Sequence, residues 1–145
     1  MRTARLRQRM AKRGIDALLV LSDSNMNNLT GYEAFSDYVP QLALVCQDEE
    51  DPWLILREQD IQCATATSYL AQSRLVSYPE KYIGSNERTA WEPIGNMVRE
   101  RAKSSHIGIE LGARLFGVKG HAALAKAWTC RRPSMQMGWF LNLSR

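Results

Sequence analysis

The sequence predicts an α/β domain with a mixed β-sheet flanked by helices. Short apolar runs of strand length recur along the chain, and segments with helical spacing of apolar residues separate them. Two neighbouring apolar runs are joined by a short polar turn, which indicates an antiparallel hairpin within the mixed α/β layer. The 145 residues are enough for one domain of ordinary size with a buried core.

The first predicted helix covers residues 3–13 and ends at Gly14, a residue that favours helix termination. Leu6 and Met10 lie four residues apart, so they are its predicted inward side chains. Every charged side chain before Asp16 is basic. A solvated amphipathic helix explains this pattern, and a phosphate-binding arm or a mitochondrial presequence are the alternatives.

The next elements are a buried strand, a short helix and the hairpin. Residues 15–21 form the predicted strand, and Ser24 is the predicted N-cap of a helix that Gly31 closes. Residues 41–46 and 52–56 are the two hairpin strands, with an acidic connection between them.

The second half of the chain continues the alternation. It predicts helices over residues 58–71, 89–103 and 115–128, strands over residues 74–78 and 106–111, and one more edge strand over residues 135–139. A polar loop fills residues 80–88. The predicted inward side chains are Ile61, Ala64 and Tyr69 in the first of these helices and Trp91, Ile94, Val98 and Ala102 in the second.

Composition excludes several classes of protein. Hydrophobic residues make up 45% and charged residues 23%, which is unlike disordered, collagenous or low-complexity chains. No apolar run approaches the ~20 residues of a membrane helix, so no membrane span is expected. Cys46, Cys63 and Cys130 form an odd set without a CxxC pair, which indicates free thiols and a cytoplasmic location.

The motifs of a self-sufficient enzyme are missing. The sequence has no HExxH pair, no GxSxG elbow and no glycine-rich phosphate loop. We interpret the acidic residues 48–51 as a solvated turn, Cys46 as a small buried hydrophobe, and Glu110 as a hydrogen-bonding group rather than a general base. The charge of +4 is only mildly basic, so a nucleic-acid partner is not expected.

Three segments together resemble a known family. They are the Gly14-Ile15-Asp16-Ala17-Leu18-Leu19-Val20 stretch, the Asn25-Met26-Asn27-Asn28-Leu29-Thr30-Gly31-Tyr32 stretch, and Ile107-Gly108-Ile109-Glu110. In order and spacing they resemble the N-terminal domain of the creatinase/prolidase/aminopeptidase P superfamily, and the likeness extends from about Arg5 to Trp128. It implies a ribonuclease-H-like arrangement of sheet and helices over residues 1–130, with residues 131–145 as a tail or the start of a linker to an absent catalytic domain.

The resemblance also implies a role. In the family this domain is non-catalytic, makes dimer contacts and closes over the substrate pocket, often that of the partner subunit. The segment Glu33-Ala34-Phe35-Ser36-Asp37-Tyr38-Val39-Pro40-Gln41 is most similar to creatinase-like amidohydrolases and ectoine hydrolases. Phe35, Asp37 and Tyr38 are therefore the candidate pocket-lining residues: the aromatic rings would exclude water and Asp37 would meet a cationic substrate. The alternative is that Phe35 and Tyr38 simply pack under the sheet.

The expected parent enzyme is a homodimeric hydrolase that cuts C–N bonds of a small molecule or peptide. No catalytic residue, metal or cofactor is expected in this chain. In the peptidase branch two divalent metal ions such as Mn are bound by two Asp, one His and two Glu of the absent domain. Two alternatives remain: a stand-alone binding or assembly module for an acidic partner or RNA, and a small thiol enzyme using Cys46, Cys63 or Cys130.

Overall fold

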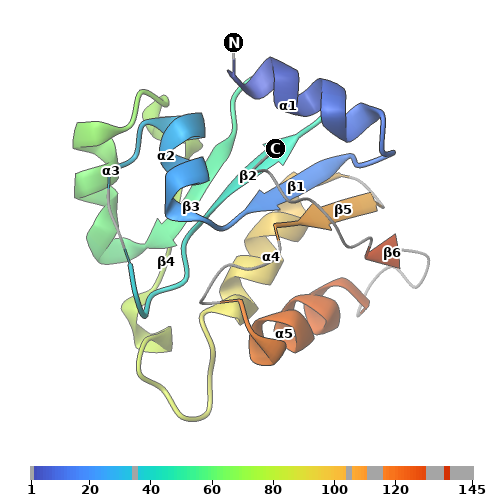
Figure 1. Ribbon diagram of the computed structural model, residues 1–145. Coiled ribbons are helices and arrows are strands. Elements are labelled where there is room, and N and C mark those ends of the chain that lie inside the picture. The colour runs from blue at the N-terminus through green and yellow to red at the C-terminus, as the bar shows by residue number, and fades with distance from the viewer. Residues whose placement is uncertain (1, 34–35, 104–105, 111–115, 130–135, 138–145) are drawn as a thin grey trace.

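A mixed β-sheet forms the centre of the structure, a computed structural model that describes residues 2–33, 36–103, 106–110, 116–129 and 136–137. The strands in these parts of the chain are β1 (Ala17–Val20), β2 (Leu42–Cys46), β3 (Trp53–Arg57), β4 (Leu75–Tyr78), β5 (His106–Ile109) and β6 (Gln136–Met137). They form one sheet in the order β4-β3-β2-β1-β5-β6 (Figure 1). Strand β2 runs antiparallel to β1 and β3, whereas β1–β5, β3–β4 and β5–β6 are parallel pairs. The predicted mixed sheet and its hairpin are confirmed.

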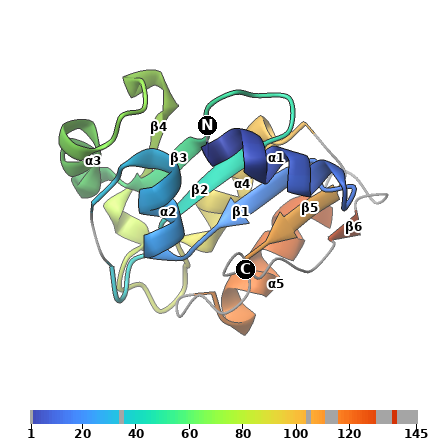
Figure 2. The same cartoon turned by 45° about the horizontal axis from the view of Figure 1, so that its top comes forward.

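Helices cover both faces of this sheet. Figures 1 and 2 show α1 (Arg2–Ala11), α2 (Asp23–Thr30) and α3 (Ile61–Thr67) on one face, and α4 (Trp91–Arg101) and α5 (Val118–Thr129) on the other. Short 3-10 turns η1 (Glu58–Asp60), η2 (Gln72–Arg74) and η3 (Glu80–Tyr82) connect elements at the β3–β4 side. Within the described parts of the chain, every helix is too short or too polar to span a lipid bilayer.

The core has two halves because both faces of the sheet are buried. In β1, Leu18 and Val20 pack toward α1 and α2, while Ala17 and Leu19 pack toward α4. The two-residue alternation of a strand sends these side chains to opposite faces. A strand covered on both sides therefore has a continuous apolar sequence, as seen here.

The apolar side chains predicted to face inward from helix α1 are buried. Leu6 is 7% and Met10 0% exposed. The helix gives way to a turn in which Gly14 has a φ of 64°, a left-handed conformation that glycine adopts readily. The basic residues Arg5 and Arg9 are exposed, which fits a solvated amphipathic helix.

The N-terminus of α2 differs from the prediction. Ser22, not Ser24, is the N-cap, and its side chain accepts a hydrogen bond from the Asn25 N–H at 3.4 Å. Ser22 is extended (φ −76°, ψ 130°) and lies two residues after the end of β1, so the helix starts two residues earlier than expected. Gly31 closes the helix with a φ of 75°, as predicted.

The predicted helix over residues 58–71 is shorter in the structure. Only Ile61–Thr67 is α-helical, and Ser68 is extended. The Tyr69 N–H and the Ser68 hydroxyl both donate to the Thr30 carbonyl, at 3.1 and 2.8 Å. These long-range hydrogen bonds replace further helical ones. Ala64 is buried and Ile61 half-buried as expected, but Tyr69 is 65% exposed, so its predicted inward position was wrong.

The last helices agree well with prediction. All four predicted inward residues here are buried, namely Trp91, Ile94 and Val98 in α4 and its C-cap Ala102. Helix α5 begins at Val118, later than predicted, because the described residues Phe116 and Gly117 are not helical. Residue 115 and the predicted end of β5 at 111 lie outside the described residues. Strand β6 falls inside the expected edge strand.

Candidate functional site

The loop that carries the candidate pocket residues is closed at its base by side-chain hydrogen bonds. The Tyr32 hydroxyl donates to Gln41 Oε1 at 3.3 Å, and Gln41 Nε2 donates to Asp23 Oδ1 at 2.9 Å. Tyr32 and Gln41 are buried, and burial raises the pKa of the Tyr32 hydroxyl, so it stays a neutral donor. The two ends of the loop are thereby tied to each other and to the first turn of α2.

Further contacts hold the second half of this loop. The Val39 N–H donates to Ser36 Oγ at 2.9 Å, and the Tyr78 hydroxyl of β4 donates to the Pro40 carbonyl at 2.5 Å. Val39 is buried at 1% exposure, whereas Asp37 and Tyr38 are exposed. The loop therefore anchors through Val39 and presents its two preceding residues outward.

Tyr38 is fixed on the surface by Arg57 of β3. Its side chain is 67% exposed, so the alternative that it packs under the sheet is wrong. Arg57 Nη1 donates to the Tyr38 hydroxyl oxygen at 3.4 Å, and the guanidinium carbon lies 5.7 Å from the ring centroid. Arg57 is itself held by Asp60 at 2.8 Å and by Glu80 at 3.5 Å. The hydrogen bond with Asp60 raises the pKa of Arg57 further, so the cation is permanent.

A cavity of about 890 Å³ lies beside Tyr38, between the loop that precedes α4 and the start of α5. This volume is in the range of small-molecule sites. Among the described residues, its walls combine aromatic and apolar side chains with the basic residues Arg88 and Lys119. The apolar part includes Tyr38, Tyr82, Ile83, Trp91 and Val118.

The structure thus brings Tyr38, one of the two predicted residues that it describes, to the cavity. Tyr38 borders it, and Asp37 is exposed in the same loop but is not among the described residues that line it. Phe35 lies outside the described residues. Sequence reasoning missed Arg57, Arg88 and Lys119, because isolated basic residues in a strand, a loop and a helix carry no local signal of convergence.

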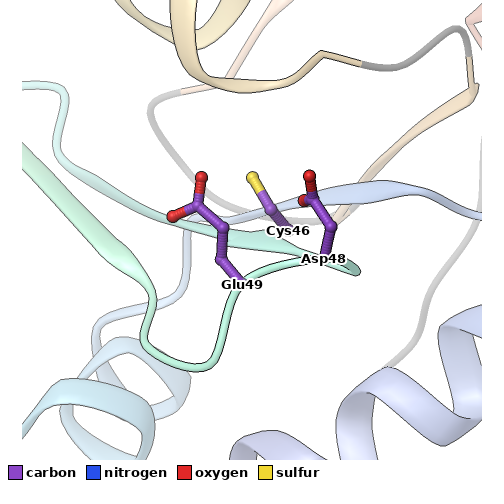
Figure 3. Close-up of side chains that lie close together, drawn as sticks. All are labelled: Cys46, Asp48 and Glu49. Atoms are coloured by element: carbon purple, nitrogen blue, oxygen red, sulfur yellow. The ribbon is translucent and has the colours of Figure 1, made fainter.

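Cys46, Asp48 and Glu49 form a second group of polar side chains, at the β2–β3 turn. Figure 3 shows the three side chains pointing to the same side of the turn, and their ligand atoms lie within 4.8 Å of one another. However, the Glu49 carboxylate accepts hydrogen bonds from Trp53 Nε1, at 2.8 Å, and from Arg74. Asp48, Glu50 and Asp51 are exposed, as expected of a solvated turn, whereas the half-buried Glu49 carboxylate joins the hairpin to η2.

Cys46 is the small buried hydrophobe that the sequence predicts, with 3% exposure. Burial first, and then the nearby Glu49 and Asp48 carboxylates, raise the pKa of its thiol to about 12. The thiol is therefore neutral at physiological pH and is a poor nucleophile.

Selective alkylation tests this environment. Iodoacetamide at pH 8 is expected to modify exposed Cys63 and to spare Cys46 in the folded chain, because only thiolate reacts and the buried thiol keeps its proton. Peptide mass spectrometry reads each site separately, and alkylation in denaturant, where Cys46 should react fully, is the control. Equal modification of Cys46 and Cys63 in the folded state would contradict the assignment.

The ordinary thiol pKa is 9.0, so the unfolded state loses the Cys46 proton at lower pH than the folded state. The free energy of unfolding that Cys46 contributes should therefore decline from about pH 9 toward about pH 12.

Comparison with known protein families shows to which family this chain is related. Residues 2–134 match the family described as "Creatinase/Prolidase N-terminal domain". The chain belongs to this family. The resemblance found in the sequence is confirmed, and so is the fold class that it implies.

Relatives of this creatinase/prolidase N-terminal domain are hydrolases by name. The chain is 40% identical over 127 residues to a Sinorhizobium fredii protein named "uncharacterized hydrolase/peptidase y4tM", covering 87% of this chain and 32% of that protein. It is 28% identical to the ectoine hydrolase of Halomonas elongata, covering 84% of this chain and 31% of that protein. The chain therefore spans about a third of the length of the curated relatives it matches.

Solved structures share the fold of this creatinase/prolidase N-terminal domain. The N-terminal domain of the cytoplasmic peptidase PepQ from Mycobacterium tuberculosis has a TM-score of 0.68 at 20% identity, with 96% of this chain and 92% of that chain covered. The prolidase of Pyrococcus furiosus has a TM-score of 0.59 at 15% identity, with 94% of this chain but 33% of that chain covered. The second match places the same fold within a much longer protein.

The family motif Ile107-Gly108-Ile109-Glu110 has a structural role in this domain. Glu110 is buried at 6% exposure and extends β5 toward the start of α2. Its Oε2 accepts the Leu21 and Ser22 N–H groups, each at 2.9 Å, and its Oε1 accepts from Asn25 Nδ2. The prediction that Glu110 makes hydrogen bonds is confirmed, and its carboxylate is placed at the positive N-terminal end of α2.

Proposed function

We propose that this chain is the non-catalytic N-terminal domain of a homodimeric hydrolase that cuts C–N bonds of a small molecule or peptide, and that it closes over the substrate pocket. Family membership and the match to about a third of longer hydrolases support the domain assignment. The observation that carries the closing role is Tyr38, an exposed ring held by Arg57 at the edge of a cavity. A fixed aromatic ring at a pocket mouth excludes water from the pocket.

The other predicted loop residues complete this proposal. Phe35 supplies a second ring and Asp37 meets a cationic group of the substrate. Residues 1–130 form the domain, and residues 131–145 lead toward the catalytic domain. The free thiols of Cys46 and Cys63 support a cytoplasmic location, where disulfides are rare.

The described residues do not fit the metal centre of the peptidase branch. Among them, the group with metal-ligand spacing is Cys46, Asp48 and Glu49, which contains no histidine and only two carboxylates. Of these carboxylates, Glu49 already accepts a hydrogen bond from Trp53 and forms an ion pair with Arg74. Any metal ions of the parent enzyme, such as Mn, are therefore proposed to be held by its catalytic domain.

The experiment that tests this function compares two exposed tyrosines in the full-length enzyme. Tyr38→Ala is expected to lower kcat/KM at least tenfold, since it opens the pocket edge to water and to misplaced substrate. Tyr69→Ala is the matched control, because Tyr69 is 65% exposed, close to the 67% of Tyr38, but does not line the cavity. Steady-state hydrolysis of a panel of Xaa-Pro dipeptides and small amides gives both values.

The isolated chain provides the other arm of the test. It is expected to cleave no Xaa-Pro dipeptide and to bind no stoichiometric Mn or Zn. Robust turnover by the purified chain would overturn the non-catalytic assignment, and equal kcat/KM losses in the two tyrosine variants would overturn the closing role.

The exposed basic face of α1 supports a second candidate function, a binding module for an acidic partner or RNA. Arg5, Arg9, Lys12 and Arg13 are exposed, and the first turn of α1 contains no acidic residue. Such binding would weaken steeply with salt. Absence of RNA or polyanion binding at low ionic strength would remove this candidate.

A further inference from the structure

Arg57 of β3 is not among the described residues that line the cavity, but it contacts both of its walls. One wall is the loop before β2, which contributes Tyr38 and Pro40, and the other includes residues 82–91, which begin in η3. Arg57 Nη1 donates to the Tyr38 hydroxyl oxygen at 3.4 Å and to Glu80 Oε1 of η3 at 3.5 Å. A single guanidinium nitrogen therefore connects the two walls.

Asp60 fixes the orientation of this guanidinium. Arg57 Nε donates to Asp60 Oδ2 at 2.8 Å, and Arg57 Nη2 donates to Asp60 Oδ1 at 3.3 Å. The two side chains are only 18% and 22% exposed. A carboxylate that accepts two parallel hydrogen bonds from arginine holds the plane of the guanidinium in place. Because Nε and Nη2 are directed at Asp60, the two hydrogens of Nη1 are left for Tyr38 and Glu80.

Glu80 is the weakest of the three contacts of Arg57 with carboxylates and the tyrosine. Its side chain is 40% exposed, and its distance of 3.5 Å to Nη1 exceeds those to Asp60. Its other oxygen, Oε2, is buried without a hydrogen-bond partner among the described residues. An unpaired buried carboxylate oxygen costs free energy, which is regained when the side chain turns to water. The Glu80 contact is therefore the one that breaks most readily.

The base of the loop has a separate and more deeply buried attachment. The Tyr78 hydroxyl of β4 donates to the Pro40 carbonyl at 2.5 Å, and Tyr78 is fully buried. Burial raises the pKa of Tyr78, so its hydroxyl remains a neutral donor. Loss of the Arg57 contacts would therefore free the Tyr38 side chain and η3, while Pro40 stays attached to the sheet.

We propose that Arg57 is a positioning residue that bridges the two walls of the cavity, and that its contact with Glu80 opens to admit a ligand. In the closed form Nη1 holds Tyr38 and Glu80 together. When Glu80 is released, η3 and residues 82–91 move away from Tyr38 and the cavity widens. The inference deepens the proposed function and rests on it in one respect, namely that the ligand is a substrate of the parent hydrolase.

Amide hydrogen exchange in the ¹⁵N-labelled 145-residue chain tests the bridge without any ligand. The Val39 N–H reports on the loop wall, since it is hydrogen-bonded within that loop. The Ile83 N–H donates to the Glu80 carbonyl at 2.9 Å and reports on the η3 wall. The Glu110 N–H donates to the Leu19 carbonyl at 2.9 Å, so it serves as the reference for the sheet. Exchange rates of these three amides distinguish local opening from global unfolding.

Arg57→Lys is the decisive variant, because it keeps the positive charge but loses the planar group that reaches three partners. Exchange at Val39 and at Ile83 is expected to become about tenfold faster, with the Glu110 rate unchanged. Unchanged rates at both walls would overturn the bridge. An equal acceleration at Glu110 would also overturn it, because Arg57 would then support the whole domain rather than the cavity walls.

Two milder variants each remove one half of the bridge. Tyr38→Phe deletes only the hydroxyl and should accelerate exchange at Val39 alone, whereas Glu80→Gln should accelerate it at Ile83 alone. Glu100→Gln is the matched control, since it removes the charge of a carboxylate that is 67% exposed in α4 and should change neither rate. Acceleration at both walls by Glu100→Gln would show that net charge, not the bridge, sets these rates.

Steady-state kinetics of the full-length enzyme tests the link to substrate. Glu80→Gln and Arg57→Lys are expected to raise KM about fivefold and to leave kcat within about twofold, because they loosen a wall and do not touch the bond that is cleaved. A lower kcat with unchanged KM, or no change in either constant, would overturn the role of the bridge in holding substrate.

The two arms separate this inference from the proposed function. Faster exchange at both walls in Arg57→Lys together with an unaffected Tyr38→Ala enzyme would leave the bridge standing and remove the closing role. A tenfold loss of kcat/KM in Tyr38→Ala with unchanged exchange in Arg57→Lys would do the reverse.

Discussion

Replacing Glu110 by alanine is expected to lower the free energy of unfolding by about 3–5 kcal/mol, a large share of a typical domain's stability. The carboxylate accepts the Leu21 and Ser22 N–H groups and the Asn25 side chain, and it is 6% exposed. Alanine would leave the Leu21 N–H buried without its acceptor. A lost charge-assisted hydrogen bond and an unsatisfied buried donor each cost about 1–3 kcal/mol.

Two further variants make this prediction specific. Glu110→Gln keeps one acceptor oxygen, so its loss should be about half that of alanine. Glu100→Ala removes a carboxylate whose side chain is 67% exposed and 3.6 Å from Arg101, and its effect should stay within about 0.5 kcal/mol. Guanidinium denaturation with an unchanged m-value measures all three. A loss in Glu110→Ala no larger than that in Glu100→Ala would show that the carboxylate does not hold the start of α2.

Gly31→Ala is expected to destabilise the domain by about 3 kcal/mol, for two separable reasons. Gly31 has a φ of 75°, which side-chain-bearing residues rarely adopt. A Cβ there would also lie 2.7 Å from Cδ1 of the Tyr69 ring and 3.3 Å from the Thr67 carbonyl oxygen. The backbone oxygen cannot move away without disturbing the end of α3.

Gly84 is the matched control for the free-energy cost of placing alanine at a positive φ. Its φ is 70°, yet a Cβ at this position would meet no atom within 4 Å. Gly84→Ala should therefore cost only about 1 kcal/mol, and the difference between the two variants measures the overlap with Tyr69 and Thr67. Thermal and chemical unfolding of both proteins gives this difference. Equal losses would mean that the Tyr69 ring moves aside without penalty.

The candidate site was predictable only in part. Tyr38 was selected from the loop sequence, and the structure places it at the cavity edge. Its partner Arg57 comes from β3, and the lining residues Trp91 and Lys119 come from two helices far along the chain. Sequence separation hides such convergence, because no local pattern reports which surfaces of distant elements meet.

Interactions between residues that are close in the sequence determined the helices and strands of this protein. Apolar runs identified β1 to β5, glycine at 14 and 31 marked the ends of helices, and Trp91, Ile94, Val98 and Ala102 gave α4 its inward face. These features depend on near neighbours in the chain, so periodicity and turn chemistry are enough to predict them.

The tertiary structure decided where those elements stop and how they pair. The Ser68 hydroxyl and the Tyr69 N–H donate to the Thr30 carbonyl, and these hydrogen bonds replace the last turn of the predicted helix. The Tyr69 side chain is exposed as a result. The placement of β1 between antiparallel β2 and parallel β5 likewise arises from contacts between distant segments. Long-range hydrogen bonds and packing outweigh the small propensities that favour one more helical turn. For this reason only the folded chain reveals where the elements end and which of them pair.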